Sequence, residues 1–111
     1  MDSVDSIIED VSKECHDDYV GLWVIVRRLR DMGVEEGSIR ETTLGIVRRL
    51  LDMENIVAGN FNTQIDEDFH EWQMSIEDTI TIIAREWQTL GRDPNIGDIV
   101  WFTSKDEQQK H

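Results

Sequence analysis

The sequence has little of several features that would indicate a function directly. Its 111 residues include only one proline. They also include only one cysteine, Cys15, so no intramolecular disulfide can hold the fold together. No apolar run approaches the roughly 20 residues that cross a bilayer. The first ten residues are acidic, whereas a signal peptide begins with basic residues. We therefore expect a cytoplasmic protein.

Motifs for catalysis and for cofactor binding are also scarce. The sequence has no glycine-rich phosphate loop and no G-x-S-x-G nucleophile elbow. One cysteine and three histidines cannot form a four-ligand zinc site unless acids join them. His16 and His70 stand beside acids, but at none of the spacings of known zinc or calcium sites. We expect no enzyme, no cofactor and no metal.

Positive charge is the third shortage. Eleven Lys and Arg residues stand against 24 Asp and Glu residues, which gives a formal net charge of −13. A field of this sign opposes binding to duplex DNA, which depends on neutralisation of phosphates by Lys and Arg. It steers a basic protein partner towards the chain instead. The alternative is that the acidity serves only solubility.

The sequence is rich in helical periodicity. Apolar residues spaced by three and four predict four helices, over residues 4–15, about 18–32, 38–53 and 75–90. Ser38 with Glu41 forms a capping-box pattern, and Ser75 is a second candidate N-cap. Gly33 and Gly91 suit the left-handed ends of the second and fourth helices.

Two short segments predict strands. Residues 56–61 and 99–103 are rich in β-branched and aromatic residues. Two short strands are not stable alone in water, so they should pair and pack against the helices. The expected fold is therefore a mainly helical α+β domain over residues 1–103, in the order helix, helix, helix, strand, helix, strand. A polar tail, residues 104–111, should follow it.

The segment between the first strand and the fourth helix combines aromatic and acidic residues. Residues 62–73, NTQIDEDFHEWQ, contain four acids and no Lys or Arg, with Phe69 and Trp72 spaced as one side of a helical turn. Aromatic residues dominate binding hot spots, and acids steer a basic partner. The predicted partner-binding residues are Asp66, Glu67, Asp68, Phe69, Glu71 and Trp72. The alternative is that Phe69 and Trp72 only pin this segment to the body of the protein.

Residues 39–61, IRETTLGIVRRLLDMENIVAGNF, resemble part of a winged helix-turn-helix domain. In that family the recognition helix ends in a basic, leucine-rich turn and runs directly into the first strand of the wing. With the preceding helices, the resemblance covers about residues 18–61. It implies DNA binding through Arg40, Thr42, Thr43, Arg48 and Arg49. The sequence departs from the pattern in the wing, because some forty residues separate the two expected strands, far more than a hairpin loop.

These observations lead to two main hypotheses. The first is a non-enzymatic acidic protein-binding module, such as an immunity or antitoxin-like inhibitor of a basic effector. The alternative is a winged-helix transcriptional regulator, which requires an open basic face built from the six arginines between Arg27 and Arg49. A third hypothesis is a homodimer formed through apolar surface on the second or fourth helix.

Overall fold

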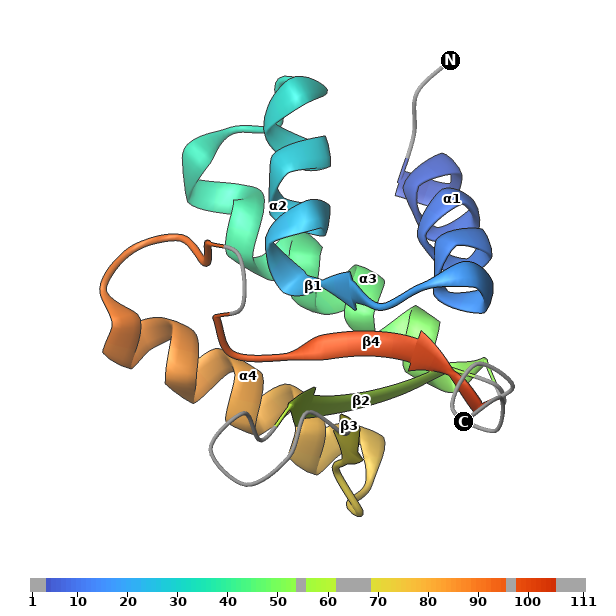
Figure 1. The fold of residues 1–111 in the computed structure, drawn as a ribbon. Helices are drawn as coiled ribbons and strands as arrows, with labels where there is room; N and C mark the ends of the chain where they lie inside the picture. Colours follow the sequence, from blue (N-terminus) through green and yellow to red (C-terminus); the bar gives the residue numbers. More distant parts are fainter. Residues whose placement is uncertain (1–3, 54–55, 62–68, 96–97, 106–111) are drawn as a thin grey trace.

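The computed structural model describes residues 4–53, 56–61, 69–95 and 98–105, which form four α-helices packed on a four-stranded sheet (Figure 1). The mainly helical α+β architecture predicted from the sequence is confirmed. None of these helices is both long and apolar enough to cross a membrane. The elements in chain order are α1 (Val4–Asp17), β1 (Val20–Gly21), α2 (Leu22–Asp31), the 3-10 turn η1 (Glu36–Ser38), α3 (Ile39–Asp52), β2 (Ile56–Phe61), β3 (Phe69–Glu71), α4 (Ile76–Leu90) and β4 (Trp101–Ser104).

The sheet is antiparallel, with strand order β1-β4-β2-β3. The predicted pairing of the two strand segments is confirmed, since β2 pairs with β4 and Ala58 lies opposite Phe102. The predicted helix between them is α4. The inner face of the sheet includes Val20, Ile56, Ala58 and Phe102, which share one core with residues of all four helices. In the view of Figure 1, α1 and α2 lie above β1 and β4, and α4 lies below β2.

Several helix ends follow the sequence signals. Gly33, directly after the α2 cap, has a φ of +85°. Its N–H donates to the carbonyl of Arg30 at 3.0 Å, and the next N–H donates to the carbonyl of Leu29 at 3.1 Å, which is a Schellman motif. Gly91 ends α4 with a φ of +71°, and the hydroxyl of Ser75 caps its start by accepting from the Asp78 N–H at 3.1 Å.

One predicted helix start and one predicted side-chain cap are wrong. The second helix begins at Leu22 and not near Asp18, because Val20 and Gly21 are held as strand β1 by pairing with β4. Ser38 makes no side-chain cap at α3. It closes the preceding 3-10 turn, and its backbone already has helical angles, φ −106° and ψ −8°. An N-cap residue needs extended angles to turn its oxygen back onto the helix.

The largest difference from the prediction lies at residues 69–71. Phe69 does not belong to a helical turn but begins β3, which pairs antiparallel with β2 and brings Phe69 opposite Phe61. A β2–β3 hairpin therefore follows α3 directly. This differs from the expectation that the strand after residues 56–61 comes only some forty residues later. At the other end of the chain, Ser104 was expected in the tail but is the last, fully buried residue of β4. Residues 106–111 lie outside the described part.

Candidate functional site

The outer face of the sheet, which points away from the helical core, carries aromatic side chains. Trp101 of β4 is paired on one side with Gly21 of β1 and on the other with Gly59 of β2. Successive residues of a strand point to opposite faces. Because Phe102 points into the core, Trp101 lies on the outer face between two glycines.

Both glycines are required by the atoms packed around them. A Cβ atom on Gly21 would lie 2.6 Å from Cδ1 of Trp23 and 3.4 Å from Cζ3 of Trp101. A Cβ atom on Gly59 would lie 2.3 Å from the backbone carbonyl oxygen of His70 and 2.6 Å from Cζ of Phe69. Real Cβ atoms do not approach other heavy atoms this closely, so any other residue would displace the rings at Gly21, and both the Phe69 ring and the β3 backbone at Gly59. Glycine inside a strand commonly marks such a close approach.

Tyr19 completes this arrangement from the residue before β1. Its ring centroid lies 5.2 Å from that of Phe69, with an angle of 37° between the planes, a favourable separation for aromatic pairs. We call Tyr19, Trp23, Phe69 and Trp101 the aromatic face. All four side chains are half-buried, so each presents some of its ring to solvent while its position is fixed by packing.

Carboxylates border the aromatic face. Asp17 and Asp18 directly precede Tyr19 and are exposed, and Asp18 Oδ1 accepts the Tyr19 backbone N–H at 2.7 Å. Glu71 lies two residues after Phe69 on the same strand, so it projects from the same face. None of these three carboxylates forms an ion pair with another described residue.

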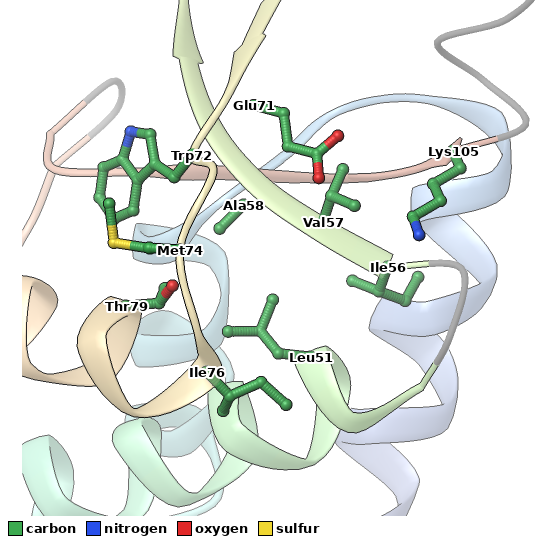
Figure 2. Close-up of a pocket in the computed structure, with 10 residues that line it drawn as sticks. All are labelled: Leu51, Ile56, Val57, Ala58, Glu71, Trp72, Met74, Ile76, Thr79 and Lys105. Atoms are coloured by element: carbon green, nitrogen blue, oxygen red, sulfur yellow. The ribbon is translucent and has the colours of Figure 1, made fainter.

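The predicted partner-binding residues are only partly brought together. Asp66, Glu67 and Asp68 lie outside the described residues, whereas Phe69 and Glu71 lie on or beside the aromatic face. Trp72 points the other way, and Figure 2 shows it on the opposite side of β2 from Glu71. Its indole packs against the core, and Nε1 donates to Asn60 Oδ1 at 2.6 Å. The prediction that Phe69 and Trp72 share one side is therefore wrong.

A hollow of about 170 Å³ lies between β2 and the start of α4, beside Trp72 (Figure 2). Most of its lining residues are apolar, but most of the surface that it exposes is polar, and Glu71 and Lys105 supply its charged groups. It contains no nucleophile paired with a base, so it offers no recognisable catalytic constellation. Its other lining residues are Leu51, Ile56, Val57, Ala58, Met74, Ile76 and Thr79.

The residues expected to contact DNA do not form one surface. Thr43 is fully buried in the core and Thr42 is half-buried. Arg40 is exposed near the start of α3 and has no ion pair within the part of the chain that the structure describes. The prediction that Thr43 faces a groove is wrong, because its position on α3 points towards the other helices.

The arginines near the end of α3 are paired with acids of neighbouring helices. Arg48 forms an ion pair with Glu77 of α4. Arg49 forms an ion pair with Asp5 of α1, with 2.5 Å between Nη1 and Oδ1. The two guanidinium groups are thus turned towards different helices and already have counter-ions.

Groups that could take part in covalent or metal chemistry are few. Cys15 is fully buried, and burial, with a smaller contribution from the nearby Glu14, raises the pKa of its thiol to about 12. The thiolate is therefore not formed at neutral pH. Across the described ranges, no group of three or more His, Cys, Asp or Glu residues could hold a metal ion.

Comparison with known protein families, with curated proteins and with solved structures finds no match to this chain. The candidate site therefore rests on its own geometry, and three of its four rings were not predicted. Tyr19 and Trp23 fall within the range predicted for the second helix, about residues 18–32, and Trp101 falls within the predicted strand 99–103. The available signal was glycine within an apolar strand segment, at Gly21 and Gly59, which indicates a close approach of rings to the backbone.

Proposed function

We propose that the chain is a non-enzymatic acidic protein-binding module that docks a basic protein partner on the aromatic face. The observation that carries this proposal is the combination of four half-exposed rings with the bordering carboxylates Asp17, Asp18 and Glu71, which form no ion pair with another described residue. Rings fixed by packing lose little conformational freedom on binding, and aromatic residues are common hot spots. The carboxylates would steer and orient a partner of opposite charge.

The distribution of ion pairs supports the same proposal. Six of the ten basic residues in the described ranges form ion pairs with acids: Lys13, Arg28, Arg30, Arg48, Arg49 and Arg92. Ten of the seventeen acids in the same ranges form none. The uncompensated charge of the surface is thus mainly negative, which suits a positively charged partner. An inhibitor of a basic effector, in the manner of an immunity protein or antitoxin, is the concrete form of this function.

Capture from extracts of the native cells tests the proposal with two matched variants. One variant neutralises the border of the aromatic face: Asp17→Asn, Asp18→Asn and Glu71→Gln. The control neutralises three acids elsewhere that also form no ion pair with a described residue: Asp31→Asn, Glu35→Gln and Glu86→Gln. Both change the formal net charge from −13 to −10.

The expected result is a basic protein that is retained by the wild type and the control and released by the face variant. A control that loses the partner equally would show that only net charge matters. Failure to retain any basic protein would contradict the proposed function. Light scattering on the isolated protein distinguishes a hetero-complex from the homodimer hypothesis.

The alternative function, a winged-helix regulator, is favoured by one observation. The β2–β3 hairpin follows α3 directly, where a winged-helix domain carries its wing. The ion pairs of Arg48 and Arg49 weigh against it, because these cations would have to leave Glu77 and Asp5 to reach phosphates. Gel-shift assays at low salt decide between the functions, since a regulator should retard duplex DNA and an acidic inhibitor should not.

A further inference from the structure

A second hollow, of about 450 Å³, lies between α2 and the segment that follows α4. Its apolar walls are Trp23 and Val26 of α2 and Pro94 of the segment after α4. Arg27, also on α2, lines the same hollow. The volume lies within the range of about 300–1,000 Å³ that is usual for small-molecule sites, which combine apolar walls with a few polar groups.

The two arginines of this hollow differ in whether they have a counter-ion among the described residues. The Arg30 guanidinium donates to both carboxylate oxygens of Glu36, at 2.9 and 2.6 Å, and forms an ion pair with Asp93. These groups therefore neutralise one another. Arg27 is exposed and has no ion pair with any other described residue. Among the described residues, Arg27 is thus the cation of this hollow that has no counter-ion, and it stands beside the apolar wall.

The wall opposite α2 is held in place by several hydrogen bonds. Asp98 Oδ2 accepts the Asn95 backbone N–H at 2.8 Å and the Arg92 guanidinium at 2.9 Å. The next residue, Ile99, has a φ of +68°, and the Val100 N–H donates to the Asp98 carbonyl at 2.8 Å. This is a γ-turn with positive φ, which is a strained conformation for a β-branched residue. Strain of this kind persists only where the surroundings fix the backbone, often at binding sites.

We propose that this hollow binds a small organic anion with a flat apolar body. The anionic group pairs with the Arg27 guanidinium, and the body lies against Trp23 between Val26 and Pro94. A cation is disfavoured because Asp93 already has Arg30 as its partner. The proposal stands on these contacts alone and does not depend on the proposed protein-binding function.

A neighbouring hollow of about 410 Å³ shares Asp93 but fits such a ligand less well. It contains Arg40, which has no ion pair with a described residue, but most of the surface that it exposes is polar. Its aromatic residue, Trp87, is only 4% exposed and offers little apolar surface. The hollow beside Arg27 is therefore the better site.

Titration with benzoate, followed by two-dimensional ¹H–¹⁵N NMR, tests the proposal. Benzyl alcohol supplies a similar body without the charge, and acetate supplies the charge without the body. We expect saturable shifts of the Trp23 indole and Asn95 amide signals with benzoate, at an affinity at least tenfold higher than for either control compound. Arg27→Gln should weaken benzoate binding at least tenfold.

Arg85→Gln is the matched control variant, because Arg85 is exposed on α4 and also forms no ion pair with a described residue. It makes the same change in net charge and should alter benzoate affinity less than twofold. Equal weakening by both variants, equal binding of benzyl alcohol, or no saturable shift would each overturn the proposal. Since Arg27 is not on the aromatic face, Arg27→Gln should still retain the basic partner, so the two proposals can fail separately.

Discussion

The two faces of the sheet differ in both the residues they use and the way those residues are held. The inner face includes the core residues Val20, Ile56, Ala58 and Phe102 and is shielded by all four helices. The outer face carries aromatic rings beside the buried Val57 and Thr103, and these rings lie against Gly21 and Gly59. Trp101 and Phe102 are adjacent in the chain, yet the first is half-buried and the second is 0% exposed.

Under the proposed function, this difference separates the residues that stabilise the fold from those that bind the partner. Residues of the inner face remove apolar area from water permanently, which is the main favourable term in folding. Rings of the outer face are ordered by local packing but keep exposed surface that a partner can still cover. Substitutions on the two faces should therefore affect different measurements.

The largest effect is expected from the neighbouring pair Phe102→Ala and Trp101→Ala. Phe102→Ala should lower the free energy of unfolding by about 3–5 kcal/mol, because it leaves a cavity in the core. Trp101→Ala should lower it by about 1–2 kcal/mol, since only part of the ring is buried, but should abolish retention of the basic partner. Urea unfolding and capture assays measure the two effects. A Trp101→Ala protein that still retains the partner would show that the outer face of the sheet does not bind it through Trp101.

The next largest effect tests whether glycine is what holds the rings. Gly59→Ala should lower the free energy of unfolding by about 1–3 kcal/mol, because the new methyl group collides with the His70 carbonyl oxygen and with the Phe69 ring. Gly45 is an exposed glycine in α3 with no atom near its absent Cβ. Gly45→Ala should therefore stabilise the protein by about 0.5–1 kcal/mol. Changes of the same sign in both variants would contradict the close packing of β3 and its Phe69 ring against Gly59.

The sequence predicted the inner face well and the outer face poorly, for physical reasons. Helical periodicity identifies Ile7, Ile8, Val11 and Ile83 as core because each helix buries one continuous stripe. The pairing of Ile56–Phe61 with the segment before the tail follows from the instability of unpaired strands. Both signals are local patterns that can be recognised in a single sequence.

The aromatic face depends on contacts between distant segments. Tyr19 packs against Phe69, which lies fifty positions later in the chain. Trp101 of β4 lies between Gly21 of β1 and Gly59 of β2, so three separate strands contribute to this contact. Phe69–Glu71 is a three-residue strand that pairs with β2, and it is too short for alternation to be recognised. The pairing of Arg48 and Arg49 with acids of α4 and α1 is likewise absent from any local pattern. Tertiary contacts decided these positions.

A smaller effect is expected from the ion pairs that distinguish α3 from the aromatic face. Asp5→Asn removes the counter-ion of Arg49, a pair whose side chains are both more than half exposed. Exposed pairs contribute at most about 1 kcal/mol, so the free energy of unfolding should fall by less than that. If the pairing is what prevents contact with phosphate, the double variant Asp5→Asn, Glu77→Gln should gain weak, salt-sensitive binding to duplex DNA in gel shifts. Strong DNA binding by the wild type would instead favour the regulator.

The smallest effect concerns the turn that leads into β4 and so sets which residues face inwards. The Asn95 backbone N–H, and then the Arg92 guanidinium, lower the pKa of Asp98 below its ordinary value of 3.8. The unfolded chain therefore binds the proton first as the pH falls, so the contribution of Asp98 to stability is fully present above about pH 4 and is lost as the pH falls through the lower native pKa. Asp98→Asn should be slightly less stable than the wild type in urea at pH 7, and this gap should close at lower pH. Arg92→Gln should lower the stability at pH 7 by less than Asp98→Asn does, because the hydrogen bond from the Asn95 N–H to Asp98 remains. A gap of equal size at pH 7 and pH 2 would mean that the side chain acts through shape alone and that its charge does not position β4.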